Sequence, residues 1–230
     1  MTLNRILESE VMDSPAEAAD YDAMDHAEVN RRFVEDLLTT ISNSEFSIQN
    51  SELDILDLGT GTALIPIELC QKLAGCRIMA ADAAVSMLEL ARYNVEVNGL
   101  TERIELAHVD AKKLPFNDAM FDVVMSNSII HHIPEPIDVL RGAVRVAKAG
   151  GLLFFRDLLR PETDEQLKDL VAVYTAGANV NQRRLFAESL HAALSLDEIR
   201  SLVTSLGFPA DTVQQTSDRH WTWPACRSSL

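Results

Sequence analysis

Short apolar runs alternate with amphipathic stretches through the first two thirds of the chain. Helical spacing fills the segments between most of these runs, and Gly75 and Asn98-Gly99 stand where helices usually end. Nearly continuous apolar strands indicate a parallel sheet that is covered on both faces. We therefore predict an α/β fold of the doubly wound, Rossmann-like type. The expected strands are 53–59, 77–82, 103–110, 121–127 and 151–157.

The pattern changes after the fifth strand. Residues 162–194 have helical spacing with no strand among them, and Ser195 and Glu198 have the spacing of a capping box that opens another helix. Two strand-like pieces at 211–217 and 220–223 follow, which suggests a seven-stranded, mostly parallel sheet with an antiparallel C-terminal pair. The expected segments are a helical lid over 1–40, a core over 41–157, a helical cap over 158–194, and a closing helix and strand pair over 195–230.

Charge and composition exclude several partners. The formal net charge is −15, from 35 acidic and 20 basic residues, so the field of the protein repels polyanions and anionic membranes. No apolar run approaches the roughly 20 residues that span a bilayer. The N-terminal stretch mixes acids with short apolar pieces, unlike a signal peptide. Cys70, Cys76 and Cys226 have no metal-binding spacing and no HExxH pattern occurs, so we expect no metal and a reduced, cytoplasmic protein.

The turn after the first strand carries the main chemical signal. Residues 55–67 read ILDLGTGTALIPI, in which an aspartate, Asp57, precedes a Gly-Thr-Gly turn. A dinucleotide-binding turn has a third glycine at its sixth position, where this chain has Leu64. A carboxylate at a strand end suits a ligand with an ammonium group better than one with a pyrophosphate. Gly59 and Gly61 allow such a ligand to approach the backbone.

Polar residues also end the following strands. Asp82 can accept hydrogen bonds from both hydroxyls of a ribose, and Asp110 with the Ala111 amide is placed for the edge of a purine. Asn127 ends the fourth strand, and open α/β sheets bind ligands at these strand ends. An ammonium group, a ribose and an adenine together describe S-adenosylmethionine.

The same stretches resemble the class I S-adenosylmethionine-dependent methyltransferases. DLGTGTA is similar to the first motif of that family, with Ala63 where a third glycine is frequent, and AADAAVSMLELARYN, VDAKKLPF and FDVVMSNSIIHHIPEP resemble three later motifs in the right order. YDAMDH at 21–26 is similar to the N-terminal segment of ubiquinone and menaquinone methyltransferases. The resemblance implies these cofactor-binding residues: Tyr21, Asp57, Gly59, Thr60, Gly61, Asp82, Ala83, Met87, Asp110, Ala111 and Asn127.

Residues for the acceptor are less well marked. Asp157 and His132 are the candidates for a general base, and Arg156 and Arg160 follow the end of the fifth strand, where they suit a small anionic acceptor. An Arg–Asp pair with a purely structural role explains Arg156 and Asp157 equally well. The cap adds three basic candidates, Arg183, Arg184 and His191.

These observations favour a methyltransferase acting on a small, possibly anionic metabolite, without nucleic-acid or membrane partners. Two alternatives stay open. A nicotinamide-dependent oxidoreductase uses a similar sheet, but the incomplete glycine pattern and Asp57 argue against it. A cofactor-modifying enzyme similar to the carboxy-S-adenosylmethionine synthases fits the same motifs.

Overall fold

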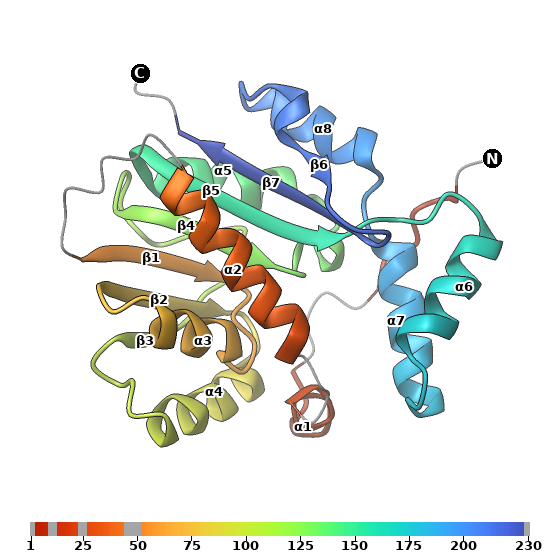
Figure 1. The fold of residues 1–230 in the computed structure, drawn as a ribbon, viewed down its shortest axis with the longest axis horizontal. Helices are drawn as coiled ribbons and strands as arrows, with labels where there is room; N and C mark the ends of the chain where they lie inside the picture. The colour runs from red at the N-terminus through yellow and green to blue at the C-terminus, as the bar shows by residue number, and fades with distance from the viewer. Residues whose placement is uncertain (1–2, 9–12, 23–26, 44–51, 228–230) are drawn as a thin grey trace. The chain divides into compact units, whose positions relative to one another are not determined.

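The computed structural model describes residues 3–8, 13–22, 27–43 and 52–227, and Figure 1 shows the fold. Strands and helices alternate along most of the chain, as predicted. The elements are α1 (Pro15–Asp22), α2 (Ala27–Asn43), β1 (Leu53–Leu58), α3 (Leu64–Lys72), β2 (Cys76–Asp82), α4 (Val85–Val97), β3 (Ile104–His108), β4 (Phe121–Asn127), the 3₁₀ turn η1 (Ile130–His132), α5 (Ile137–Val146), β5 (Ala147–Leu158), α6 (Asp164–Tyr174), α7 (Val180–Ala192), α8 (Leu196–Ser205), η2 (Ala210–Thr212), β6 (Gln214–Gln215) and β7 (His220–Cys226).

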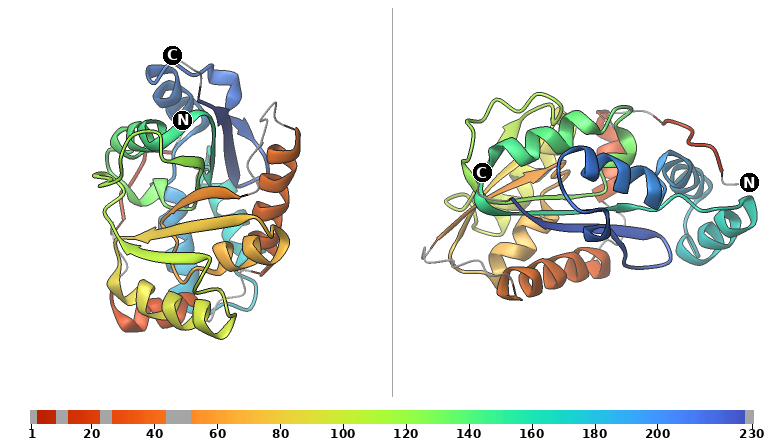
Figure 2. Two further views of the ribbon diagram at one scale, coloured as in Figure 1. Left: turned by 90° about the vertical axis from the view of Figure 1, so that its left-hand side faces the viewer. Right: turned by 90° about the horizontal axis from the view of Figure 1, so that it is seen from above.

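The strands form one seven-stranded sheet in the order β3-β2-β1-β4-β5-β7-β6. Strand β1 pairs in parallel with β2 and β4, and β2 pairs in parallel with β3. Strands β6 and β7 are antiparallel, with Gln214 opposite Thr222. The two further views in Figure 2 show α2 and α3 on one face of the sheet and α5 on the other. The predicted doubly wound fold with an antiparallel C-terminal pair is therefore confirmed.

The chain divides into two compact units. The larger unit comprises 11–127, 138–155 and 224–230, and the smaller unit comprises 1–10, 128–137 and 156–223. This division differs from the four consecutive segments expected from the sequence, because each unit is assembled from pieces far apart along the chain. Residues 27–40 in particular do not form a separate lid: helix α2 packs on α3 and buries Phe33, Val34 and Leu37 in the core of the larger unit.

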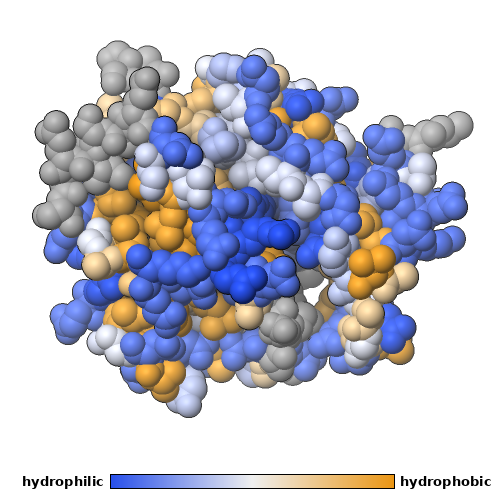
Figure 3. Space-filling model, viewed as in Figure 1, coloured by the Kyte–Doolittle hydropathy of each residue, from blue (hydrophilic) through white to orange (hydrophobic). Residues whose placement is uncertain are grey.

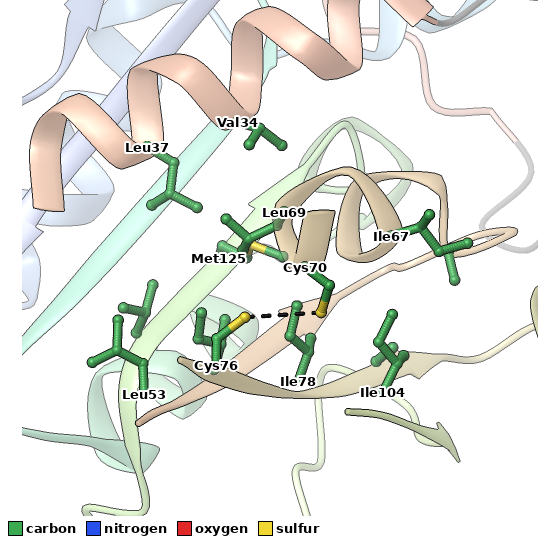
Figure 4. Packing of buried hydrophobic residues seen from close by; sticks show 14 of the residues in the cluster. Val34, Leu37, Leu53, Ile67, Leu69, Cys70, Cys76, Ile78, Ile104 and Met125 are labelled. Carbon is green, nitrogen blue, oxygen red and sulfur yellow. Dashed lines mark hydrogen bonds between the residues drawn. The ribbon is translucent and has the colours of Figure 1, made fainter. Parts of the chain in front are cut away.

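The core of the larger unit fills the space between the sheet and helices α2 and α3. Figure 4 shows part of this cluster, where leucine, isoleucine and methionine side chains surround two cysteines. The Cys70 and Cys76 sulfur atoms lie 3.8 Å apart as free, buried thiols, and Arg103 donates a hydrogen bond to the Cys76 sulfur at 3.1 Å. Cys226 is a free and exposed thiol.

A second, smaller cluster holds the predicted cap together. Leu158, Leu167, Leu170 and Leu190 pack between β5, α6 and α7, and Leu3 of the N-terminal segment packs against them. This segment is fixed mainly by Arg5. The Arg5 guanidinium donates hydrogen bonds to four carbonyl oxygens, those of Ala192, Pro134, His131 and Ile133, at 2.7–3.2 Å. One side chain therefore links the N-terminal segment, the end of α7 and the η1 turn.

The surface is largely polar on the side that is drawn. On the face drawn in Figure 3, hydrophilic residues predominate and hydrophobic residues occur in separate patches. Within the described ranges, no helix combines the length and the apolar character that a membrane span requires.

The capping box at the start of α8 is confirmed and supplies a stability prediction. The Ser195 hydroxyl accepts a hydrogen bond from the Glu198 N–H, and the Glu198 carboxylate accepts one from the Ser195 N–H. Ser195→Ala should lower the free energy of unfolding by about 1 kcal/mol in urea denaturation. The control is Ser205→Ala at the exposed end of the same helix, where no cap is lost. Equal effects of the two substitutions would contradict this role.

Candidate active site

The turn between β1 and α3 has an unusual backbone conformation. Gly59, Gly61 and Ala63 all have positive φ angles, of 73°, 55° and 64°. This conformation suits glycine but costs an alanine roughly 1–2 kcal/mol, so the turn is a local concentration of strain. The Gly59 and Thr60 amides both donate to the Ala81 carbonyl of β2, at 2.8 and 3.0 Å. The turn is therefore fastened to the neighbouring strand while its inner surface is left open to a ligand.

Asp82 at the end of β2 adds a side-chain hydrogen bond between the turn and this strand. One carboxylate oxygen accepts a hydrogen bond from the Gly61 N–H at 2.8 Å, and the other accepts one from the Ala84 N–H at 2.8 Å. Each carboxylate oxygen has two lone pairs, so a carboxylate that accepts one backbone amide at each oxygen can also accept a ligand hydroxyl. The two amides fix the orientation of the Asp82 side chain.

A pocket lies beside this turn at the carboxyl ends of β1 and β4. Four of the residues that line it carry a buried side-chain oxygen with no hydrogen-bond partner in the structure: Asp57, Thr60, Thr62 and Asn127. Buried polar atoms are almost always hydrogen-bonded, and leaving one unpaired costs roughly 1–3 kcal/mol. Four such atoms at one pocket indicate a binding site for a polar ligand. Asn30 of α2 also lines the pocket.

Asp57 dominates the electrostatics of the pocket. Its side chain is 2% exposed, and this burial raises the pKa of the carboxyl from 3.8 to about 7. The nearby Asp82 carboxylate raises the pKa further, while the Thr60 hydroxyl opposes the shift. Without a partner, the charged form of Asp57 is thus disfavoured near neutral pH. A cationic group bound in the pocket would stabilise the charge.

The other predicted cofactor residues lie in α1, in the segments that follow β2 and β3, and in α4, and among them the side chains that the structure describes do not line the pocket. Asp110 follows β3, and although burial alone would raise the pKa of its carboxyl, a hydrogen bond from the Lys112 N–H and the Lys112 ammonium at 3.0 Å lower it. Ala83 and Ala111 are half-buried in the loops after β2 and β3. Met87 packs with Ala18 and Ala84 between α1 and α4. Tyr21 belongs to α1, but its side chain and most of 21–26 lie outside the described residues.

Asp157, one of the two candidates for a general base, is paired with a histidine. Asp157 interacts with His131 and not with His132: its Oδ1 atom lies 2.5 Å from His131 Nδ1. The Ile130 and Leu158 amides also donate to the Asp157 carboxylate, at 2.5 and 2.6 Å. A carboxylate that is 1% exposed and holds three hydrogen bonds is placed to orient His131 and lacks the access of a general base.

The smaller unit adds Glu8 to this pair. Glu8 Oε1 lies 3.5 Å from His131 Nε2 and 3.1 Å from His132 Nδ1. Burial opposes charge on Asp157 and His131, but their mutual attraction outweighs it, so the pKa of Asp157 is lowered and the pKa of His131 is raised. Sequence reasoning missed Glu8 because it is more than 120 residues away along the chain.

The predicted arginine cluster has structural contacts instead. Arg160 is buried and donates to the Ala193 carbonyl at 3.0 Å and to the Glu198 carboxylate at 2.7 Å. Arg156 is buried and its Nε donates to Thr222 Oγ1 at 2.9 Å. Arg183 and Arg184 bond to groups of their own helix and of the turn before it. These contacts give no support to an anion-binding role.

A more open hollow lies at the amino-terminal ends of β1 to β3. It is lined by charged residues such as Asp54, Arg77 and Arg103. Arg77 pairs with Asp54 at 3.2 Å, and Arg103 is bonded to backbone carbonyls. Ligands of open α/β sheets bind at the opposite, carboxyl ends of the strands, so the pocket at Asp57 is the better candidate.

Comparison with known proteins agrees with this geometry. Residues 56–155 match the family described as "Methyltransferase domain", a range that runs from β1 into β5. Over this range the match confirms the resemblance to methyltransferases seen in the sequence. The chain is 30% identical to a malonyl-[acyl-carrier protein] O-methyltransferase of Geobacter sulfurreducens over 83% of its own length and 66% of that protein. It is 35% identical to a ubiquinone biosynthesis O-methyltransferase of Roseobacter denitrificans over 44% of its own length and 39% of that protein.

Solved structures show the same fold. The plantazolicin methyltransferase, in complex with a monoazolic desmethyl-plantazolicin analogue and S-adenosylhomocysteine, superposes with a TM-score of 0.68 at 14% identity. The match covers 92% of this chain and 89% of that one.

The two sequence relatives are longer proteins than this chain. The aligned part of the chain spans 66% of the malonyl-[acyl-carrier protein] O-methyltransferase and 39% of the ubiquinone biosynthesis O-methyltransferase.

The raised pKa of Asp57 predicts a pH-dependent ligand affinity. Because the free carboxyl holds its proton up to about pH 7, binding of a ligand with an ammonium group should release that proton at lower pH. Affinity for S-adenosylhomocysteine should be about tenfold weaker at pH 6 than at pH 8, as measured by calorimetry. Without ligand the sign is opposite: the folded state binds the proton more tightly than the unfolded chain, so this carboxyl lowers stability as pH rises from about 4 to 7.

Asp57→Asn provides the control for this prediction. The amide cannot titrate, so the variant should bind weakly at both pH values with no proton release, and its stability should lack the Asp57 contribution. Equal affinity of the unsubstituted protein at pH 6 and pH 8 would contradict a buried, titrating Asp57 in contact with the ligand.

Proposed function

We propose that the protein is an S-adenosylmethionine-dependent methyltransferase that acts on a small molecule. The observation that carries this proposal is the set of four buried, unpartnered oxygens beside the Gly59–Ala63 turn. In the proposed complex Asp57 receives the ammonium group of the cofactor, Asp82 receives the ribose hydroxyls, and Asp110 with the Ala111 amide receives the adenine edge. The methyltransferase-domain match over the same residues supports this arrangement.

The cofactor supplies a methyl group on a sulfonium, which is already a good leaving group. The work left to this chain is to hold the cofactor in one orientation, to bring an acceptor in line and to exclude water. Asp57 and Asp82 fix the cofactor at two points. No described side chain combines the exposure and the free lone pair of a general base with a place in the pocket, so we assign none.

Oxygen is the acceptor atom that the named relatives favour, since both are O-methyltransferases. A small metabolite remains the proposed acceptor class. An anionic acceptor held by Arg156 and Arg160 is a weaker proposal, because Arg160 pairs with Glu198 and Arg156 bonds to Thr222. Neither a nicotinamide-dependent oxidoreductase nor a carboxy-S-adenosylmethionine synthase is favoured by the named relatives. A screen of metabolite extracts with methyl-labelled cofactor tests the activity directly, and absence of labelled product from every extract would count against it.

Asp82→Ala tests the cofactor site. Loss of a hydrogen bond to a charged group costs roughly 1.5–3 kcal/mol, so affinity for S-adenosylhomocysteine should fall by roughly ten- to a hundredfold. Asp118→Ala is the matched control, because Asp118 is an exposed carboxylate that pairs with Arg145 on the surface. If Asp82→Ala binds as tightly as the unsubstituted protein, or if NAD binds better than S-adenosylhomocysteine, the assignment fails.

A further inference from the structure

Two histidines and a glutamate converge within the smaller unit in a way that the proposed methyl transfer does not use. His131 and His132 are consecutive residues of the η1 turn, and their rings stack with centroids 4.1 Å apart. Glu8 reaches both rings from the N-terminal segment. One ligand atom from each of the three residues lies within 4.8 Å of the other two.

The positions of these atoms are compatible with one metal ion bound between them. Glu8 Oε1 and His132 Nδ1 are 3.1 Å apart, yet both are buried and neither has a hydrogen-bond partner, because the contact lacks hydrogen-bond direction. Ligands bound to zinc at about 2.0–2.2 Å in tetrahedral geometry are roughly 3.3–3.5 Å apart. The separations of Glu8 Oε1 from the two ring nitrogens, 3.1 and 3.5 Å, lie close to this value.

In His131 and Glu8, the polar atom that faces away from the other two residues already has a hydrogen-bond partner. The Asp157 carboxylate accepts a hydrogen bond from the Nδ1–H of His131, which in the neutral ring leaves the Nε2 lone pair facing Glu8. The Ser189 hydroxyl donates to Glu8 Oε2 at 3.1 Å, which leaves Oε1 facing the histidines. Metal-binding histidines usually donate their other N–H to a carboxylate or carbonyl in this way. When His131 is neutral and no cation is bound, the Nε2 lone pair and the Glu8 oxygen face each other as two acceptors.

The surrounding chain keeps the three residues in place. Arg5 is three residues before Glu8 and bonds to the carbonyls of His131 and Ile133, so it fixes the segment and the turn together. Glu8 is 11% exposed and His131 4%, while His132 is 21% exposed. The site is thus preformed and largely enclosed, with His132 on its accessible side.

We propose that Glu8, His131 and His132 bind one transition-metal dication such as Zn²⁺. Two imidazoles and a carboxylate suit Zn²⁺, Co²⁺ or Fe²⁺, whereas Mg²⁺ and Ca²⁺ prefer oxygen ligands alone. Three protein ligands leave at least one coordination position for water or for an oxygen-bearing ligand. This site revises the expectation from sequence spacing that the protein has no metal site. It is independent of the proposed function, since binding is measurable without methyl transfer.

The test is a titration of the full chain, after treatment with a chelator, with Co²⁺ and then Zn²⁺. We expect one Co²⁺ per chain with the visible spectrum of nitrogen and oxygen ligands, its displacement by Zn²⁺, and a higher Tm with Zn²⁺. Glu8→Gln, which keeps the shape and the Ser189 hydrogen bond, and His132→Asn should each weaken Zn²⁺ binding at least tenfold. Asp157→Asn, which removes a supporting carboxylate, should weaken it by roughly ten- to a hundredfold.

Two controls separate this site from other metal-binding groups. His108→Asn changes an exposed histidine of the larger unit and should leave binding unchanged. Cys76→Ser removes one thiol of the buried pair, and a thiolate-to-cobalt absorption band that disappears in this variant would place the metal at the cysteines and overturn the proposal. Absence of stoichiometric binding would also overturn it. So would unchanged Zn²⁺ affinity in folded Glu8→Gln and His132→Asn proteins, with folding judged by circular dichroism and by Tm without metal.

Discussion

The buried carboxylate of Asp57 is the constraint on which the rest of the candidate site depends. An isolated charge at this depth is strongly disfavoured, and among the described residues no cationic side chain offsets this cost, so burial raises the pKa of Asp57 to about 7. The neighbouring oxygens of Thr60, Thr62 and Asn127 have no partner either. A fold that keeps four such groups beside a strained glycine turn carries a cost that a bound polar ligand can offset. The identity of these groups then determines the ligand: it must bring a positive charge and hydrogen-bond donors.

The position of Asp57 follows from the sheet. Parallel pairing of β1 with β2 and β4 brings three strand ends to one edge, so the polar residues that end them meet although they are far apart in sequence. Asp82 then ties the turn after β1 to the loop after β2 through two backbone amides. In the smaller unit, side-chain hydrogen bonds and not strand pairing bring the polar residues together. Arg5 and Asp157 hold Glu8 and two stacked histidines in fixed orientations.

How much the sequence predicts depends on the distance over which an interaction acts. The strands, the capping box at Ser195 and the strand-end residues Asp57, Asp82 and Asn127 follow local patterns, and all were predictable. Asn30 was missed because α2 was taken for part of a lid, although the spacing of Phe33, Leu37 and Ile41 along that helix indicates packing on a core. The contact of Asp157 with His131 was not predicted, because a 3₁₀ turn, and not a regular strand or helix, positions both rings. Arg160 and Glu8 depend on partners 38 and more than 120 residues away, which no local pattern contains.

The central claim is that Asp57 and Asp82 bind the two polar ends of S-adenosylhomocysteine. A crystal structure of the protein grown with S-adenosylhomocysteine tests it most directly. The account predicts the ligand amino group within hydrogen-bond distance of Asp57 and both ribose hydroxyls at the Asp82 carboxylate, with Asn127 and the threonine oxygens gaining partners. A ligand bound elsewhere, or one whose amino group points away from Asp57 into solvent, would contradict it.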